Sequence, residues 1–434
     1  MRVTARSGKT NARGGGTTTA EARRAQPGYD YALLLGVVGL VVIGLLMTYS
    51  ATFDWAVQDM GSRFAKFRWQ LLWVAIGAAL LVAFARVPYN WWQRVAVQIF
   101  IATLALLAGV LLIGAGRGAQ GAEVFRRGFL GGSIQPSEAA KLGLVIYMAA
   151  WISSKGERIR DVTYGLVPFA VLIGVLAGLL VLQPDLSAAL LAITVAVAMF
   201  FVGGADIFQM ALASAVGGVT LYLLISSSDY ATQRISDWVL LWNNPTALGD
   251  RGWHNLQALM ALGSGGIFGM GLGQGVQKTG YLPAPHTDSI FAVIGQETGL
   301  LGCLVVLALL VLITYRGFRI ALESTEGFAS LLAFGLTTWT AVQALLNVGV
   351  VTGLVPFTGV ALPFISFGGS ATVTSLAGVG LLLSISRGNR VGRRVERAER
   401  TERPERQQAN LDRRWWNGGT RVSRPRRRAH VGRR

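Results

Sequence analysis

The sequence predicts an all-α integral membrane protein with ten transmembrane helices, and three observations support this class. Of the 434 residues, 52% are hydrophobic and only 14% are charged, whereas a soluble domain carries about 25% charged residues. The apolar residues lie in long blocks rather than in an amphipathic pattern, which is typical of membrane spans. Basic residues gather at connections that would share one side of the bilayer.

Ten blocks approach the roughly 20 residues that a helix needs to cross a bilayer. They cover residues 31–52, 70–87, 93–115, 135–154, 163–182, 186–203, 207–226, 289–315, 327–352 and 367–386. The first block is long enough to span and follows a polar, basic segment, so we expect a membrane helix rather than a cleaved signal peptide.

The basic residues predict that both termini face the cytoplasm. That side would also carry the loops at 155–162 and 316–326. The opposite side would carry the loops at 53–69, 116–134, 183–185, 227–288 and 353–366. Because these outer loops hold almost every unusual motif, we expect the chemistry to be extracytoplasmic.

The two ends of the chain differ in composition from the ten-span domain at 29–387. Their composition predicts that residues 1–28 form a disordered basic arm and that residues 388–434 form a disordered arginine-rich tail. The net charge of +18 lies largely in this tail. Beside a membrane helix, such a tail indicates a cytoplasmic topology signal that touches anionic lipid, and we expect no nucleic-acid partner.

The fourth span begins with Gln135-Pro-Ser-Glu138-Ala-Ala-Lys141. Proline suits a first helical turn. Glu138 and Lys141 are three residues apart and therefore share one helix face. They form either a structural ion pair or a lysine that its acid holds near an anionic ligand.

A short polar turn, Gln183-Pro-Asp185-Leu-Ser187, separates the fifth and sixth spans. Its proline breaks the helix. Asp185 either caps the sixth span or contributes to a site at the outer face, level with the other polar motifs.

The outer loop at 227–288 is too long for a simple connector. Its run Gly-Ser-Gly-Gly-Ile-Phe-Gly-Met-Gly-Leu-Gly-Gln-Gly at 263–275 permits tight turns and close approach to a ligand. The spacing does not match a nucleotide loop, because no strand precedes it. The alternative is a short re-entrant or half-buried helix that packs through small residues.

The same loop ends in a dense polar run from Lys278 through His286, Thr287 and Asp288 to Glu297. A carboxylate costs about 2.5–3.5 kcal/mol at the centre of a membrane helix and less near the interface, so it is a functional candidate by default. Asp288 either caps the eighth span or takes part in chemistry.

The last span follows Pro356-Phe-Thr-Gly-Val-Ala-Leu-Pro-Phe-Ile-Ser366-Phe-Gly-Gly-Ser370. The backbone N–H groups of Gly368, Gly369 and Ser370 at a helix start suit a phosphate. The alternative is a rigid structural turn.

Several site classes find no support in the sequence. His254 and His286 are too far apart for a zinc motif, and no Walker sequence is present, so we expect no nucleotide. The single cysteine, Cys303, excludes a disulfide within the chain and most simply packs in an apolar block.

These motifs, in this order on ten spans, resemble the SEDS family (shape, elongation, division and sporulation), which comprises the FtsW and RodA proteins. The resemblance covers about residues 29–387. It rests on Gln-Pro-Ser-Glu-x-x-Lys at 135–141, Gln-Pro-Asp-Leu at 183–186, Leu-Pro-x-x-His-Thr-Asp at 282–288 and Leu-Pro-Phe-Ile-Ser-x-Gly-Gly-Ser at 362–370. Gln277-Lys278…Tyr281-Leu-Pro favours the FtsW branch. The chain departs from the family at Ala284 and Gln296, where acids are usual.

The resemblance implies a peptidoglycan glycosyltransferase. Such an enzyme polymerises lipid II at the outer face of the bacterial cytoplasmic membrane, releases undecaprenyl pyrophosphate and works in septal division. Its partners would be a class B penicillin-binding protein, other division proteins and the bilayer. The alternatives are a RodA-type elongation polymerase and a lipid II flippase or other transporter.

The residue roles implied by the resemblance centre on Asp288 as general base. The candidate substrate-binding residues are Glu138, Lys141, Gln135, Asp185, Gln183, Arg68, Lys278, His286, Thr287, Glu297, Ser366, Gly368, Gly369 and Ser370. Arg126 and Arg127 are further candidates for holding the leaving pyrophosphate. A divalent cation, magnesium or manganese, is another candidate for this role, with Asp185 and Asp288 as its candidate ligands. The alternative for Asp185 is that it shapes the pocket.

Overall fold

Helices form where the sequence places its apolar blocks, and no strand occurs among the described residues. The computed structural model describes residues 28–60, 64–115, 135–226, 229–245, 248 and 252–389. The predicted arm at 1–28 and tail at 388–434 therefore lie almost wholly outside the described residues, as do Arg126, Arg127 and the rest of the 116–134 loop.

The elements follow one another along the described chain. They are α2 (Tyr31–Met60), α3 (Ala65–Arg86), α4 (Tyr89–Arg94), α5 (Ala96–Ala115), α8 (Pro136–Lys155), η1 (Gly156–Arg160), η2 (Val162–Leu166), α9 (Val167–Leu182), α10 (Leu186–Val202), α11 (Ile207–Ser226), α12 (Asp229–Asn243), α13 (Gly252–Gly265), η4 (Gln277–Thr279), α14 (Ile290–Leu322) and α15 (Gly327–Val351). A last helix covers Gly369–Asn389.

Helices lie over the predicted spans, although 93–115 is divided between α4 and α5, and 163–182 between η2 and α9. Among the described residues, six helices are long and apolar enough to cross a membrane. Large apolar side chains also face outward, including Leu35, Phe208 and Val311 with exposures of 70%, 68% and 66%. Exposed apolar area of this extent suits lipid rather than water. The chain is thus a multi-pass membrane protein.

The eighth helix is longer than the sequence predicts. The predicted span ends at residue 315, whereas α14 continues to Leu322. Arg316 lies in this extension and forms an ion pair with Asp30, just before α2. This pairing and the polar surroundings of a helix end allow a basic residue inside the helix.

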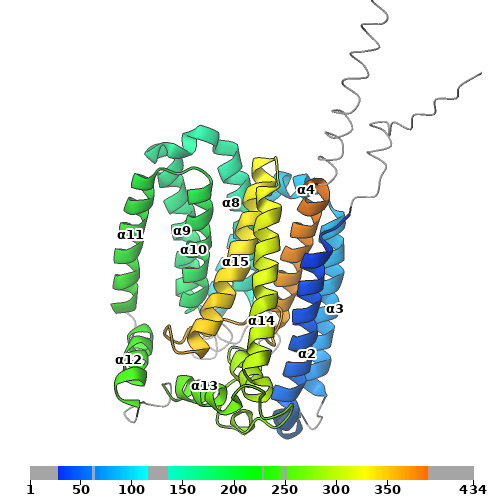
Figure 1. The fold of residues 1–434 in the computed structure, drawn as a ribbon. Helices are drawn as coiled ribbons and strands as arrows, with labels where there is room; N and C mark the ends of the chain where they lie inside the picture. Colours follow the sequence, from blue (N-terminus) through cyan, green and yellow to red (C-terminus); the bar gives the residue numbers. More distant parts are fainter. Residues whose placement is uncertain are drawn as a thin grey trace, which may run out of the picture. The chain divides into compact units, whose positions relative to one another are not determined.

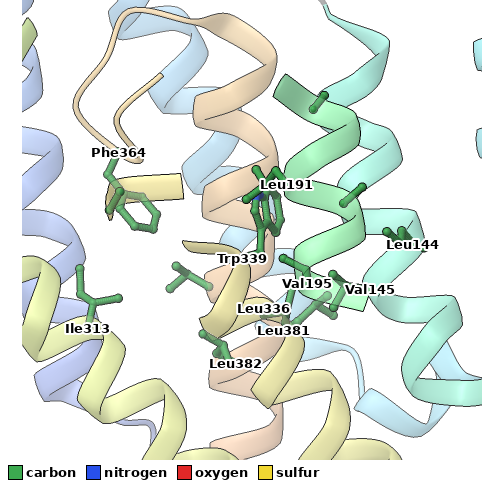
Figure 2. Packing of buried hydrophobic residues seen from close by; sticks show 14 of the residues in the cluster. Leu144, Val145, Leu191, Val195, Ile313, Leu336, Trp339, Phe364, Leu381 and Leu382 are labelled. Atoms are coloured by element: carbon green, nitrogen blue, oxygen red, sulfur yellow. The ribbon is translucent and has the colours of Figure 1, made fainter. Parts of the chain in front are cut away.

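Helix α15 lies at the centre of the bundle. It packs against α14, α8 and α10, and Figure 1 shows it between α14 and the α8–α10 group. Leu336 and Trp339 of α15 lie in one buried cluster with Leu144 of α8, Leu191 of α10 and Leu382 of the last helix (Figure 2). This rigid central helix supplies polar side chains to the site described below.

Helices α8, α10, α14 and the last helix begin at the same end of the bundle (Figure 1), and local sequence sets where they begin. Pro136 occupies the first turn of α8, where its missing N–H costs nothing. Asp185 caps α10 by accepting the N–H of Ala188 at 3.0 Å. Helix α14 and the last helix begin at this end too, α13 lies across it, and α12 lies at the same end below α11 (Figure 1). The polar motifs at these helix starts therefore converge.

Helix α14 is broken near its start, and the glycine-rich run docks on the break. Gly299 has φ 67° and ψ −166°, which interrupts the helical hydrogen bonds. Met270 and Gly271 donate N–H bonds of 2.9 and 3.0 Å to the freed carbonyls of Gln296 and Glu297. The glycine-rich run is thus part of the packed helix start rather than a ligand loop on its own.

We expect Gly269→Ala to destabilise the fold more than Gly273→Ala. Both glycines have positive φ, of 80° and 81°, so alanine costs about 1–2 kcal/mol at either position. At Gly269 an added Cβ would also lie 2.2 Å from the carbonyl oxygen of Glu297, whereas Gly273 has open space. Thermal unfolding in detergent measures the difference, and equal melting temperatures would contradict this docking.

Candidate active site

Hydrogen bonds join the polar motifs at the shared end of the bundle. The backbone N–H of Gln135 donates to Ser370 Oγ at 2.9 Å, and Gln135 Nε2 donates to Asp185 Oδ2 at 3.0 Å. Ser187 Oγ donates to the carbonyl of Thr358 at 2.5 Å. The starts of α8, α10 and the last helix are therefore tied to one another and to the loop at 353–368, which we call the clamp loop.

Asp288 sits half-buried just before α14, and its backbone is fixed by α15. Asn347 Nδ2 donates to the carbonyl of Asp288 and to that of Val360, both at 2.7 Å. The Asp288 side chain accepts one bond at Oδ1, from the Thr287 hydroxyl at 2.9 Å. Among the described residues, no group donates to Oδ2. This oxygen is open to a ligand.

The cap interpretation of Asp288 finds no support. The N-cap of α14 is Ser289, which makes no side-chain cap bond. Since the Asp288 carboxylate accepts from Thr287 and not from a helix N–H, it does not serve the helix start as Asp185 does.

The clamp loop holds the segment that carries Asp288. Ser366 Oγ donates to the carbonyl of Thr287 at 2.5 Å and accepts the N–H of Leu362 at 2.8 Å. The N–H of Phe367 donates to the carbonyl of His286 at 2.8 Å. Phe364, with φ 66°, adopts the left-handed backbone that costs about 1–3 kcal/mol in a non-glycine residue. The surrounding bonds stabilise this strained turn.

Lys141 is buried in α8 and bound from three sides. Its Nζ lies 2.8 Å from Glu138 Oε1 and 3.3 Å from Gln343 Oε1, and 5.5 Å from the centre of the Trp339 ring. Gln343 Nε2 in turn donates to the carbonyl of Ala361 at 2.9 Å. Lys141 therefore reaches the clamp loop through one glutamine.

Helix α15 connects this lysine to Asp288. Gln343 and Asn347 are four residues apart and thus lie on one face of α15. The first binds Lys141 and the second binds the backbone of Asp288. Glu138 keeps its Oε2 without a hydrogen-bond partner among the described residues, so the pair retains capacity for one more donor.

A second buried ion pair lies deeper in α14. Lys278 Nζ is 2.5 Å from Glu297 Oε1, and both side chains are at most 3% exposed. Ser50 of α2 donates to both Glu297 oxygens, at 2.7 and 2.6 Å, and accepts from Lys278 at 2.9 Å. Glu297 is seven residues into α14, about 10 Å along its axis. The structure thus groups these two residues with Ser50 rather than with Asp288.

Lys66, rather than the predicted Arg68, faces the site from α3. Arg68 is exposed, whereas Lys66 is buried and close enough to His286 to lower its pKa. Gln70 lies one turn further along α3, and its Nε2 is 3.5 Å from the carbonyl oxygen of Ser366. The i, i+4 pair of Lys66 and Gln70 at the start of an apolar span is the signal that sequence reasoning missed.

His254 of α13 lies against the start of α14. Its Nε2 is 2.5 Å from Ser289 Oγ, and its ring lies 4.3 Å from that of Phe357. Burial lowers the pKa of His254, nearby Asp288 raises it and Arg234 lowers it. The Arg234 guanidinium lies 5.2 Å from the Phe357 ring. His254 and Arg234 are therefore polar neighbours of the site that the sequence motifs did not indicate.

The remaining predicted residues have structural partners or positions. Gln183 Nε2 donates to the carbonyl of Leu107 at 2.8 Å. Gly368, Gly369 and Ser370 begin the last helix, where backbone N–H groups lack intrahelical partners. Their position suits an anion.

The donor set for a metal is limited. Both oxygens of Asp185 are engaged, one with the N–H of Ala188 and one with Gln135. Within the described ranges, no group of three His, Cys, Asp or Glu residues is placed to hold a metal ion. Among the acids of these motifs, Asp288 Oδ2 and Glu138 Oε2 are the carboxylate oxygens that accept from no described residue.

Comparisons with known proteins agree with this architecture. A family model described as "Cell cycle protein", for FtsW, RodA and SpoVE, matches residues 31–391. The chain is 38% identical to a probable peptidoglycan glycosyltransferase FtsW of Geobacter metallireducens over 82% of this chain and 94% of that protein. It is 36% identical to the stage V sporulation protein E of Bacillus subtilis over 83% and 98%.

Two solved structures resemble the fold. One belongs to a study of polymerization and crosslinking by a peptidoglycan synthase complex, with a TM-score of 0.65, 28% identity and coverage of 83% of this chain and 98% of that chain. The other is the rod shape determining protein RodA of Thermus thermophilus, with a TM-score of 0.60, 28% identity and coverage of 83% and 97%.

We expect His286 to make the fold sensitive to acid. Burial and then nearby Lys66 lower its pKa from the ordinary 6.5 to about 4. Between these values the unfolded chain binds a proton that the folded chain does not, so stability present above pH 6.5 is lost as pH falls toward 4. In thermal unfolding over this range, wild type should lose stability relative to His286→Gln. Parallel curves for the two proteins would refute the assignment.

Proposed function

We propose that this chain, which belongs to the FtsW, RodA and SpoVE family of cell cycle proteins, is a peptidoglycan glycosyltransferase that polymerises lipid II and releases undecaprenyl pyrophosphate. The family membership and the names of its relatives support the reaction. The observation that carries the site assignment is Asp288. It is half-buried, fixed through its backbone by Asn347, and open at one carboxylate oxygen.

Asp288 acts as the general base. The sugar hydroxyl of the acceptor must lose a proton as it attacks the anomeric carbon of the donor. Asp288 Oδ2 takes that proton, while Thr287 holds Oδ1 and thereby orients the carboxylate. A positioned base of this kind contributes about 10²–10⁴-fold to the rate. The diphosphate is already a good leaving group, so a second carboxylic acid is not needed, in contrast to a glycosidase.

Positive charge and N–H donors receive the departing diphosphate. We assign this role to the N–H groups of Gly368, Gly369 and Ser370 together with Lys141, which Glu138 and Gln343 hold in place. Lys66 adds a cation near the clamp loop that the family motifs do not contain. Lys278 serves the Ser50–Glu297 cluster instead.

A divalent cation, magnesium or manganese, fits this site only with help from the substrate. Asp288 Oδ2 is needed for the proton transfer and both Asp185 oxygens are engaged, so the diphosphate and water would supply most of the ligands. Magnesium is commonly held by one or two carboxylates together with phosphate oxygens and water. Such an ion would neutralise charge on the diphosphate.

We assign the protein to the bacterial cytoplasmic membrane at the division septum. In the topology that we propose, with ten spans and cytoplasmic termini, the Asp288 end lies on the outer face. The basic residues of the N-terminal arm and of 155–162 support this orientation. A class B penicillin-binding protein is the expected partner. The fold shared with a chain from a peptidoglycan synthase complex supports this pairing.

The deciding experiment incubates the purified protein and its cognate penicillin-binding protein with labelled lipid II. Asp288→Asn keeps the size of the side chain and removes the base, so glycan formation should fall by about 10²–10⁴-fold. Glu157→Gln, an exposed acid in η1 beyond the far end of α8, is the matched control and should retain activity.

Equal product from Asp288→Asn and wild type would overturn the base assignment. Transfer of lipid II across vesicles by the wild type, without polymer, would favour a flippase. Expression of the protein in cells defective in division, and separately in cells defective in elongation, distinguishes the two roles. Rescue of division supports the septal role, and rescue of elongation supports a RodA-type role.

A further inference from the structure

One exposed segment of the chain is apolar without being a predicted span. Residues 266–276, which we call the dip segment, carry Ile267, Phe268 and Leu272 with exposures of 59%, 80% and 64%. No charged residue occurs between His254 and Lys278. An exposed apolar surface of this kind in a loop indicates an interaction site.

The first half of the dip segment, at 266–271, exchanges backbone hydrogen bonds with the break in α14. Met270 and Gly271 donate backbone N–H bonds to carbonyls of α14, and two residues of α14 donate N–H bonds to carbonyls of the dip segment. Leu300 donates its N–H to the carbonyl of Gly266 at 2.9 Å, and Leu301 donates to that of Ile267 at 3.2 Å. Irregular backbone at membrane depth requires such internal partners, because lipid offers none. These bonds give part of the segment, at 266–271, the internal partners that lying in hydrocarbon requires.

The exposed side chains of the dip segment continue a surface that already faces lipid. Leu300, Leu301 and Leu304 of the spanning helix α14 are 53%, 49% and 50% exposed. Two of these residues are the ones that bond the dip segment. Ile267 and Phe268 thus extend the lipid-facing side of α14, which favours acyl chains as their partner over water or a charged protein surface.

We propose that residues 266–276 form a re-entrant segment that inserts Ile267, Phe268 and Leu272 among the acyl chains of the leaflet on the Asp288 side of the bilayer. Its hydrogen bonds to Gln296 and Glu297 anchor it to the helix that begins two residues after Asp288. The segment thereby fixes the depth of the site relative to the lipid headgroups, where the reacting part of a lipid-linked substrate lies. Only this last consequence rests on the proposed function.

Spin-label accessibility in proteoliposomes tests the insertion. In a Cys303→Ala background, Phe268→Cys and, separately, Leu272→Cys are labelled with a nitroxide. Collision with dissolved oxygen and with a water-soluble nickel chelate is then measured. Leu304→Cys on α14 is the lipid-facing reference, and Glu157→Cys in η1 is the water-facing reference.

If the segment is inserted, labels at positions 268 and 272 should have the same accessibility to oxygen and to nickel as the label at position 304. Their accessibility to nickel should be well below that of the label at position 157. Nickel accessibility equal to that at Glu157 would overturn the proposal in favour of a solvated loop. Low accessibility to both reagents would overturn it in favour of a protein partner on this surface. Because none of these readouts needs turnover, failure here leaves the glycosyltransferase assignment unaffected, and the converse also holds.

Discussion

The site depends on the two hydrogen bonds that the carboxamide of Asn347 donates. It donates at 2.7 Å to two backbone carbonyls, of Asp288 and of Val360, that belong to different loops. Both loops are irregular, and a buried carbonyl without a partner costs about 1–3 kcal/mol. Asn347 comes from α15, the central helix of the bundle. One side chain therefore transfers the rigidity of the packed core to the segment that carries the candidate base.

Charge pairing explains why Asp288 stands apart from the other acids near it. Glu138 and Glu297 each lie beside a buried lysine, and breaking such a pair by removing one partner costs about 3–5 kcal/mol. Asp185 uses both oxygens to hold the starts of α10 and α8. Asp288 has neither a buried lysine partner nor a helix start to cap, and its Oδ2, like Oε2 of the paired Glu138, accepts from no described residue. Glu138, Glu297 and Asp185 thus have structural partners, and Asp288 is the acid to which the proposed function assigns the proton transfer.

Much of the fold and part of the site follow from the sequence for identifiable physical reasons. The apolar blocks predict where the helices lie. Proline, aspartate and glycine at the helix starts predict that the polar motifs lie at one end of the bundle. The partners of those motifs lie inside apolar spans, as with Gln343 and Asn347, and a lone amide in such a span gives no local indication of what it binds. Their nearness in the sequence predicts that Lys278 and Glu297 lie with Asp288. In three dimensions they bind Ser50 of α2. The glycine-rich run docks near Gly299 through hydrogen bonds between two irregular backbone segments. The spacing of apolar residues in the sequence does not predict such a contact.

Lipid II polymerisation by Asn347→Leu tests the central claim most directly. Leucine keeps the volume of the side chain and removes both hydrogen bonds, so the base should lose its position while the substrate surfaces remain. A misplacement of about 1 Å can cost about 10²-fold in rate, and we expect kcat to fall on this scale with KM nearly unchanged in a protein that still folds. An Asn347→Leu protein with wild-type kcat would show that Asp288 does not depend on this amide, and would contradict the account.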